Sequence, residues 1–384
     1  MFEMPWESKT VEKLREEFVL AARTSGNFSS LCREFGITRK TGYKWIERFE
    51  NGMELSDRSK KPNVIANKTS EEVEKIILSL RKENPGWGAK TIKTVLENQG
   101  YDNIPCAKTV NNILDRNGCI SNEESEKRHK YIRFQRNSCN EMWQTDFKGD
   151  FGLNNGKRCY PLDIIDDCSR YLIKIIPSDT TKNIVIPAFE SAFKEYGMPL
   201  SVLSDNGGQF AGFKQGYTQF EKWLMRLDIL PIHGRVRHPQ TQGKIERFHR
   251  TLNEELLKHK SFNNIEHADR EIQAWREKYN TVRPHEALNM LTPAEVYEKS
   301  NREYTGKITN YEYSGDYPVL KVNYKGYISF DFQRIYFSET FVGEYLEFRP
   351  NPLGDSFYAF FRNFRIAEFD SVSGIRLNRS IYRL

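Results

Sequence analysis

The stretch Met142-Trp143-Gln144-Thr145-Asp146-Phe147 opens the segment that decides the fold of this chain. Two further apolar runs follow it, Cys159–Asp166 and Tyr171–Pro177, and glycine and polar residues separate the three. Short apolar runs divided by turn residues are typical of successive antiparallel strands. We therefore predict a three-stranded meander, with Asp146 inside its first strand.

Helices and strands are expected to alternate after the meander. The predicted elements are a helix from about Lys182 to Tyr196, a strand Leu200–Ser204, a helix Lys222–Leu227, a strand Ile229–Ile232, and a long helix from about Lys244 to His259. A meander followed by such alternation is the layout of a ribonuclease H-like α/β core.

Three acidic residues stand at defined places in this predicted core. Asp146 lies in the first strand, Asp205 ends a strand before Asn206-Gly207-Gly208, and Glu246 lies in the first turn of the long helix. On that helix Ile245, Phe248, Leu252 and Leu256 form the predicted buried stripe, so Glu246 points to another face, shared with His249, Arg250 and Asn253. Two Asp and one Glu on rigid elements are hard oxygen ligands suited to Mg²⁺ or Mn²⁺. A pair of such ions can support in-line phosphoryl transfer.

Each acidic residue alone has an ordinary structural explanation. An Asp after a strand is usually part of a turn, and a Glu in a first helical turn usually complements the helix dipole. Their ordered occurrence is more specific, with 58 residues between the first two and 40 between the last two.

The first 118 residues predict two helical DNA-binding units. Asn27 caps one short helix, Gly36-Ile37 makes a turn, and Thr38 caps a helix from Arg39 to Phe49. This pattern fits a helix-turn-helix, with Val11, Leu14, Phe18 and Ala22 on a preceding amphipathic helix. A second unit begins at Ser70, and Lys108 opens its last helix. The other interpretation of the first unit is a small helical bundle with Trp45 and Phe49 in its core. Both can hold, with Arg39, Lys40, Tyr43 and Lys44 facing outward.

The fold class predicted is multidomain α+β, with an all-α helix-turn-helix part, a ribonuclease H-like α/β core and a small all-β C-terminal domain. The last of these rests on the aromatic and β-branched residues after Tyr304, which predict an antiparallel barrel or sandwich. Its tail, Arg376–Leu384, is expected to be disordered or to touch DNA. The predicted domains are 1–60, 61–118, a linker 119–139, the core 140–300, and 301–384.

Composition narrows the class of protein. The 384 residues carry a net charge of +6, and the first 140 residues hold about +5 of it. The six cysteines form no CxxC pair, and the seven histidines do not fall into finger-like spacing with them, so we expect no zinc. Without a signal peptide or a membrane-length apolar run, a cytoplasmic chain with reduced thiols and no membrane partner is expected.

The residues of the core resemble the DDE catalytic domain shared by retroviral integrases and bacterial insertion-sequence transposases. The stretches that carry the resemblance are Trp143–Gly149, Ile165–Tyr171, Ser204–Phe210, His238–Leu252 and Tyr279–Tyr297. The whole chain resembles an insertion-sequence branch that has tandem N-terminal helix-turn-helix units, similar here over Leu31–Trp45 and from Pro85 onward.

The resemblance implies that Asp146, Asp205 and Glu246 are catalytic residues and metal ligands, with two Mg²⁺ or Mn²⁺ ions. It implies that water cleaves the element end to leave a 3′-hydroxyl, which then attacks target DNA. Two departures stand out: no His/Cys zinc unit precedes the core, and the gap between the second and third carboxylates is longer than the retroviral pattern. The extra residues are expected within Ala211–Gln219.

Neighbouring polar residues are interpreted separately. We take Asp163, Asp166 and Asp167 as structural residues or backup ligands, Asn206 and Gln209 as turn residues, and His285 as a packing residue. His249 is open between a phosphate contact and a bystander. The predicted DNA contacts are Arg39, Lys40, Tyr43, Lys44, Lys108, Arg235, Arg237, Lys244, Arg247 and Arg250.

The expected partners are double-stranded DNA, both transposon ends and target, and further copies of the chain in a dimer or larger assembly. Two other functions compete with a DNA transposase. One is a catalytically silent DNA-binding regulator, which the intact carboxylate triad argues against. The other is a general nuclease, which has no need of tandem helix-turn-helix units.

Overall fold

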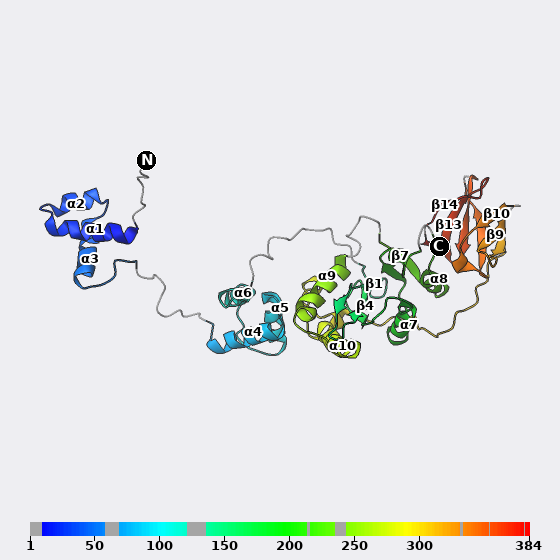
Figure 1. The fold of residues 1–384 in the computed structure, drawn as a ribbon, viewed down its shortest axis with the longest axis horizontal. Helices are drawn as coiled ribbons and strands as arrows, with labels where there is room; N and C mark the ends of the chain where they lie inside the picture. The colour runs from blue at the N-terminus through cyan, green and yellow to red at the C-terminus, as the bar shows by residue number, and fades with distance from the viewer. Residues whose placement is uncertain are drawn as a thin grey trace. The chain divides into compact units, whose positions relative to one another are not determined.

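The structure, a computed structural model, describes residues 10–57, 69–120, 136–212, 216–234, 243–330, 333–352, 354–379 and 381–384 (Figure 1). The chain forms two compact units, Met1–Lys68 and Thr69–Leu384, and each is described by itself.

The first unit is a three-helix domain. Thr10, Asn27 and Thr38 accept hydrogen bonds from the backbone of the first turns that they cap. The core contains Phe18 and Trp45, as predicted for Trp45, whereas Val11 and Leu14 of the predicted stripe are exposed. The buried face of the first helix therefore starts a turn later than the periodicity suggested, at Phe18 and Val19. The helices are α1 (Val11–Thr24), α2 (Phe28–Glu34) and α3 (Arg39–Glu50).

Close approach of α2 and α3 depends on Gly42. A Cβ atom there would lie 2.8 Å from the Phe18 ring and 3.0 Å from the Cys32 sulfur. The glycine lets the last helix of the unit pack tightly across the other two, as in a helix-turn-helix.

The second unit begins with another group of three helices, which has its own core around Ile77, Trp87, Ile92, Val110 and Ile113. Ser70 caps the first helix as predicted. The helices are α4 (Glu71–Glu83), α5 (Ala89–Asn98) and α6 (Ala107–Arg116). Both predicted helix-turn-helix parts are thus helical.

A five-stranded sheet lies at the centre of the α/β core, with strand order β5-β4-β1-β6-β7 among the described residues. The meander β1-β4-β5 is antiparallel, whereas β6 and β7 run parallel to β1, which confirms the predicted ribonuclease H-like layout. A short hairpin inside the meander was not predicted. The strands are β1 (Trp143–Phe147), the hairpin β2 (Phe151–Gly152) and β3 (Arg158–Cys159), β4 (Leu162–Asp166), β5 (Leu172–Ile176), β6 (Ser201–Ser204) and β7 (Leu230–His233).

Helices cover both faces of this sheet. On one face α7 (Val185–Tyr196) and α8 (Gln219–Arg226) pack on Trp143, Ile164 and Val202. On the other, α9 (Gly243–Leu252) and α10 (Ile265–Thr281) pack on Ile165 and Ile175 (Figure 1). The predicted stripe of the long helix is buried, although its last part, Asn253–Leu257, is a π-helix. The short helix α11 (Pro293–Val296) closes the core.

The C-terminal part is an antiparallel β domain, as predicted. Its described strands form a six-stranded sheet and a separate hairpin, β9–β10, around a phenylalanine-rich core. The strands are β8 (Val319–Lys321), β9 (Tyr327–Phe330), β10 (Gln333–Tyr336), β11 (Tyr345–Pro350), β12 (Ser356–Phe361), β13 (Phe364–Asp370), β14 (Arg376–Asn378) and β15 (Tyr382–Arg383).

The expectation that the tail is disordered was wrong, and its alternative, contact with DNA, stays a prediction. Arg376–Asn378 and Tyr382–Arg383 are strands paired with β13. The Arg376 guanidinium lies 5.6 Å from the centre of the Tyr217 ring and donates to the carbonyl of Phe337. The arginines of the tail hold the β domain together and tie it to the core, so their charge is used inside the protein.

Candidate active site

Three carboxylates lie side by side on three neighbouring strands. In the parallel pair β1–β6, Trp143 stands opposite Val202 and Gln144 opposite Leu203. Continuing this register places Asp146 level with Asp205, just past the end of β6. In the antiparallel pair β1–β4, Asp146 stands directly opposite Asp163. Directly opposed residues project from the same face of a sheet, so all three carboxylates face α9.

The electrostatics of Asp146 reflect this crowding. Burial, and then the nearby Asp163 carboxylate, raise the pKa of Asp146 to about 7; Asp205 adds to the effect and His249 opposes it. A carboxyl group so placed is held near its protonation midpoint at neutral pH. A bound cation would relieve the repulsion that sets this value.

Asp205 is held by the turn that follows it. Its Oδ1 accepts a hydrogen bond from the Gly207 amide at 2.9 Å. A Cβ atom on Gly207 would lie 2.9 Å from the same oxygen, so only glycine leaves the carboxylate this position. Asn206 donates to the carbonyl of Gly234 at 2.8 Å and Gln209 donates to the Thr181 hydroxyl, so both side chains bind distant segments and not only the turn predicted for them.

His249 joins the carboxylate row from α9. Its Nε2 lies 2.9 Å from Oδ2 of Asp163, which is fully buried. Burial alone would lower the pKa of His249, but the Asp163 charge, the hydrogen bond to Asp163 and the Asp146 charge together raise it. His249 thus pairs with a buried carboxylate next to Asp146, a contact that neither expected role included.

Lys244, which is predicted to contact phosphate, forms an ion pair within the protein, and its contact with DNA stays a prediction. Its ammonium lies 2.5 Å from Oδ2 of Asp167, a fully buried carboxylate that Gln144 also contacts. This cation sits two residues before Glu246 and the His249 pair lies three residues after it. The two pairs fasten the first turns of α9 to the sheet on either side of Glu246, whose own side chain is exposed.

The other rival carboxylate is structural. Asp166 accepts hydrogen bonds from the Asn140 amide and from the amide and hydroxyl of Ser169, at 2.7 to 2.8 Å. Its acceptors are occupied within the fold, whereas Oδ1 of Asp163 is buried without a hydrogen-bond partner. Of the three rivals, Asp163 is the one placed beside the predicted ligands.

The fit of a divalent cation rests on donor chemistry. Asp146 and Asp205 offer hard oxygens from adjacent strand ends, and crowding of like charge favours a cation between them. Within the described residues no three acidic, histidine or cysteine side chains converge closely enough to hold a metal ion. Glu246 thus has suitable chemistry and a fixed helix, but stands apart from the other two.

His285 shows the packing role expected of it. It meets the Tyr279 ring edge-on at a centroid distance of 4.8 Å, and burial together with Arg283 and Arg170 lowers its pKa to about 3. A neutral, half-buried imidazole of this kind anchors the loop after α10.

The predicted DNA contacts fall into three groups. Arg39, Lys40, Tyr43 and Lys44 are exposed on α3, as is Lys108 on α6. Arg247 and Arg250 are exposed on α9, alongside Glu246. Arg235 and Arg237 lie outside the described residues.

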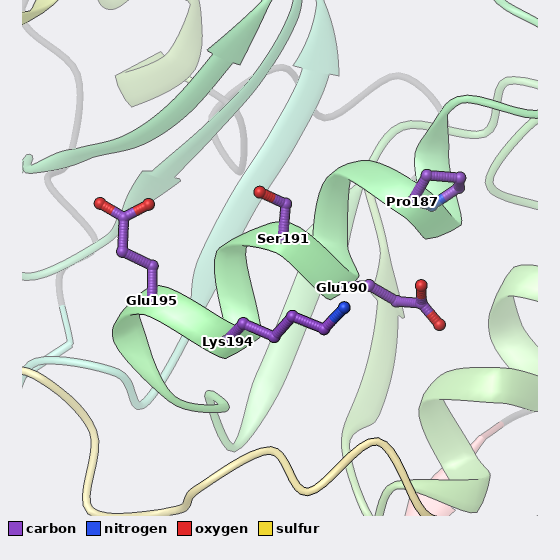
Figure 2. Close-up of a pocket in the computed structure, with 5 residues that line it drawn as sticks. All are labelled: Pro187, Glu190, Ser191, Lys194 and Glu195. Carbon is purple, nitrogen blue, oxygen red and sulfur yellow. The ribbon is translucent and has the colours of Figure 1, made fainter.

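A surface hollow on α7 stands apart from this site. Figure 2 shows its lining residues, Pro187, Glu190, Ser191, Lys194 and Glu195, all from that one helix. None belongs to the carboxylate row, and α7 covers the opposite face of the sheet.

No helix in the described part of the chain is both long and apolar enough to span a membrane.

Sequence reasoning missed a further polar cluster, in which Glu221 of α8 contacts His233 of β7 and Arg379 of the β domain. Only one local signal was present: Thr218 and Glu221 have the spacing of a capping box, which the structure contains. The other partners lie far away in the sequence.

Comparison with known families agrees with the geometry. The integrase core domain family matches residues 136–239 and, in a second model, residues 227–293. A homeodomain-like domain matches residues 41–114 and a helix-turn-helix domain matches residues 14–62.

Several similar proteins come from bacterial insertion elements. The chain is 30% identical over 161 residues to the insertion element IS407 uncharacterized 31.7 kDa protein of Burkholderia multivorans. The aligned region covers 42% of this chain and 56% of that protein. It is 24% identical over 228 residues to transposase InsD for insertion element IS2 of Escherichia coli. This aligned region covers 56% of this chain and 74% of that protein. The chain thus spans about half the length of the IS407 relative.

Among solved structures, the catalytic core domain of HTLV-2 integrase in complex with magnesium is 20% identical and covers 41% of this chain and 97% of that one. The TM-score of this match is 0.32.

Proposed function

Because the chain carries an integrase core of the DDE superfamily behind helix-turn-helix domains, we propose that it is an insertion-sequence transposase. It binds the ends of its element as double-stranded DNA, exposes 3′-hydroxyls there and joins them to target DNA. The observation that carries this proposal is the level placement of Asp146 and Asp205 on adjacent parallel strands. Glu246 lies on α9, which packs against the same face of the sheet.

In this proposal Asp146, Asp205 and Glu246 hold two Mg²⁺ or Mn²⁺ ions. When bound, the ions supply charge neutralisation for the attacking and leaving oxygens of an in-line displacement. The row of buried strand ends keeps the two aspartates in one place, and the Lys244 and His249 pairs keep the glutamate helix in register. The protein thus contributes mainly positioning.

Both chemical steps have the same balance. First, a water oxygen attacks a phosphodiester at the element end, the P–O bond breaks, and the 3′-oxygen leaves and gains a proton. Next, the 3′-hydroxyl loses its proton and attacks a phosphodiester of target DNA, and the new 3′-oxygen leaves. One bond forms and one breaks in each step, with no covalent bond to the protein.

DNA recognition in this proposal rests on the exposed residues of α3 and α6. The first residues of the last helix in a helix-turn-helix reach base edges, and nearby cations contact phosphates. Arg247 and Arg250 flank the glutamate on the exposed side of α9, where a phosphate backbone at the site would pass. Joining two ends requires two such sites, so the active form is expected to be a dimer or larger assembly of the chain.

The test uses labelled duplexes from the DNA that flanks the gene, with wild type and Glu246→Gln, in Mg²⁺ or Mn²⁺. Joined products that vanish in the variant support the transposase. Specific end binding without cleavage by either protein would indicate a silent regulator. Cleavage of random duplexes as readily as of the element ends would indicate a general nuclease.

A further inference from the structure

A chain of buried polar contacts links the C-terminal β domain to the second carboxylate of the site. We call it the Asp205 relay, and its members in order are Arg379, Glu221, His233 and Ser204.

The relay begins with an ion pair between domains. Arg379 follows strand β14 and donates to Oε1 of Glu221, which is fully buried on α8. The guanidinium also lies 4.7 Å from the centre of the Tyr217 ring, whose hydroxyl donates to the carbonyl of Ile366 in β13. Tyr217 and Met225 belong to the core of the β domain, so this contact is part of a continuous packed surface.

The middle of the relay lies at the end of the sheet. Nε2 of His233 lies 2.8 Å from Oε1 of Glu221. Since a carboxylate only accepts, the imidazole donates from Nε2 and its Nδ1 faces the Ser204 hydroxyl at 3.2 Å. Although burial acts to raise it, the hydrogen bond from His233 and the Arg379 charge hold the pKa of Glu221 below its ordinary value.

The relay ends on the residue before Asp205. Ser204 is buried, stands opposite His233 in the parallel register of β6 and β7, and accepts at its carbonyl from the Gly234 amide at 3.0 Å. Asn206, on the other side of Asp205, donates to the carbonyl of Gly234. The Ser204 carbonyl and the Asn206 side chain, one on each side of Asp205, are thus both bonded to Gly234 after the end of β7.

A structural explanation for these contacts is that they only join two domains. That interface already has other pairs that do so, including Arg226 with Glu344 and Arg383 with Asp228. The relay differs from them in its complete burial at Glu221 and in where it ends. Breaking this pair would leave a buried charge without compensation, which is costly. The link is therefore expected to stay formed.

We propose that the Asp205 relay positions this carboxylate for a divalent cation, so that docking of the C-terminal β domain is a requirement for a competent site. The inference rests on the proposed function, because it treats Asp205 as a metal ligand. Ser204, His233, Glu221 and Arg379 are positioning residues, which act on the cation through Asp205.

The experiment measures Mn²⁺ binding to the full chain by titration calorimetry, together with hydrogen exchange over residues 201–208. Glu221→Gln and Arg379→Gln are expected to weaken Mn²⁺ binding roughly ten-fold or more and to raise exchange at the end of β6. Arg379→Lys, which keeps the charge, should recover part of the affinity. The matched control is Arg383→Gln, which breaks a partly exposed pair at the same interface and should stay within about two-fold of wild type.

Ser204→Ala keeps the test decisive if a charge variant fails to fold, because it removes a single hydroxyl. It should weaken Mn²⁺ binding while the melting temperature and DNA-end affinity stay near those of wild type. Mn²⁺ affinities for the Gln variants and Ser204→Ala that match the Arg383→Gln control would overturn the relay.

The relay and the proposed function can fail separately. If the wild type never joins DNA but the relay variants still lose Mn²⁺ affinity, the transposase proposal fails and the relay stands. If DNA joining depends on the three carboxylates but the relay variants bind Mn²⁺ as tightly as the wild type, the transposase proposal stands and the relay fails.

Discussion

Asp146 and Asp205 stand on two paired strands, whereas Glu246 stands on a helix that side chains hold in place. Pairing of β1 with β6 sets the spacing of the two aspartates, and the proposed Asp205 relay supports the second of them. Glu246 stands on a helix whose register depends on the Lys244–Asp167 and His249–Asp163 pairs. The site therefore has a strand half, Asp146 and Asp205, which strand pairing positions. It also has a side-chain half, Glu246, whose position depends on two buried ion pairs.

The largest expected effect comes from removing either half outright. Asp146→Asn, Asp205→Asn and Glu246→Gln should each lower the rate of end joining by about 10³-fold or more, because each removes a ligand charge. Joining rates under single-turnover conditions measure this. The halves should differ in stability, since Asp146→Asn relieves buried repulsion and Glu246→Gln changes an exposed group. Equal melting temperatures for all three metal-free variants would contradict the comparison.

The side-chain half can be broken without touching a ligand. His249→Leu leaves the Asp163 carboxylate buried and unpaired, which should cost about 3 kcal/mol of unfolding free energy and slow joining. Denaturant unfolding and joining rates measure both effects. The control is the double variant Asp163→Asn with His249→Gln, which leaves no uncompensated charge and should regain most of the stability. A single variant as stable as wild type would show that the pair does not hold α9.

The strand half should make stability depend on pH when metal is absent. The folded pKa of Asp146, about 7, exceeds its ordinary value of 3.8, so the folded state binds more protons between these values. Unfolding free energy should therefore fall as pH rises through this window, by at most about 1.4 kcal/mol per pH unit. The slope should shrink in Asp146→Asn and when Mg²⁺ is added. Melting curves at several pH values test it, and an unchanged slope in the variant would count against the crowded site.

The smallest effects belong to the predicted DNA contacts on α3, which are part of neither half. Lys40→Ala and Lys44→Ala should each weaken DNA binding modestly and reduce the salt slope of binding by about 1. Affinities measured over a range of salt concentrations give this slope, with Lys157→Ala as an exposed control away from the helix-turn-helix. Mn²⁺ binding should be unaffected, and a loss there would place these lysines in a different role.

Local patterns predicted the elements better than they predicted the links between them. The stripe Ile245, Phe248 and Leu252 is buried because apolar periodicity states directly which helix face meets the core. The order of the meander and of the strands after it followed from runs of apolar residues. The capping box of Thr218 and Glu221 was also present in the sequence as a local signal.

The links were missed because they join residues far apart in the chain. Lys244 looked like an exposed cation, and only the turn after β4 brings Asp167 to it. Arg379 looked like part of a basic tail, and nothing near it in the sequence indicates Glu221 as its partner. Charge alone predicts solvent exposure, so a buried ion pair between distant segments is what sequence reasoning finds hardest.

The fastening of α9 by side chains also bears on how such chains can evolve. Because Lys244 and His249 fix the position of α9, that position does not depend on the length of the segment that leads to the helix. Insertions between Asp205 and Gly243 add only a small closure cost and need not displace the glutamate. The spacing of 40 residues between the last two carboxylates is then free to drift among descendants, while the anchoring pairs are the part that selection must keep.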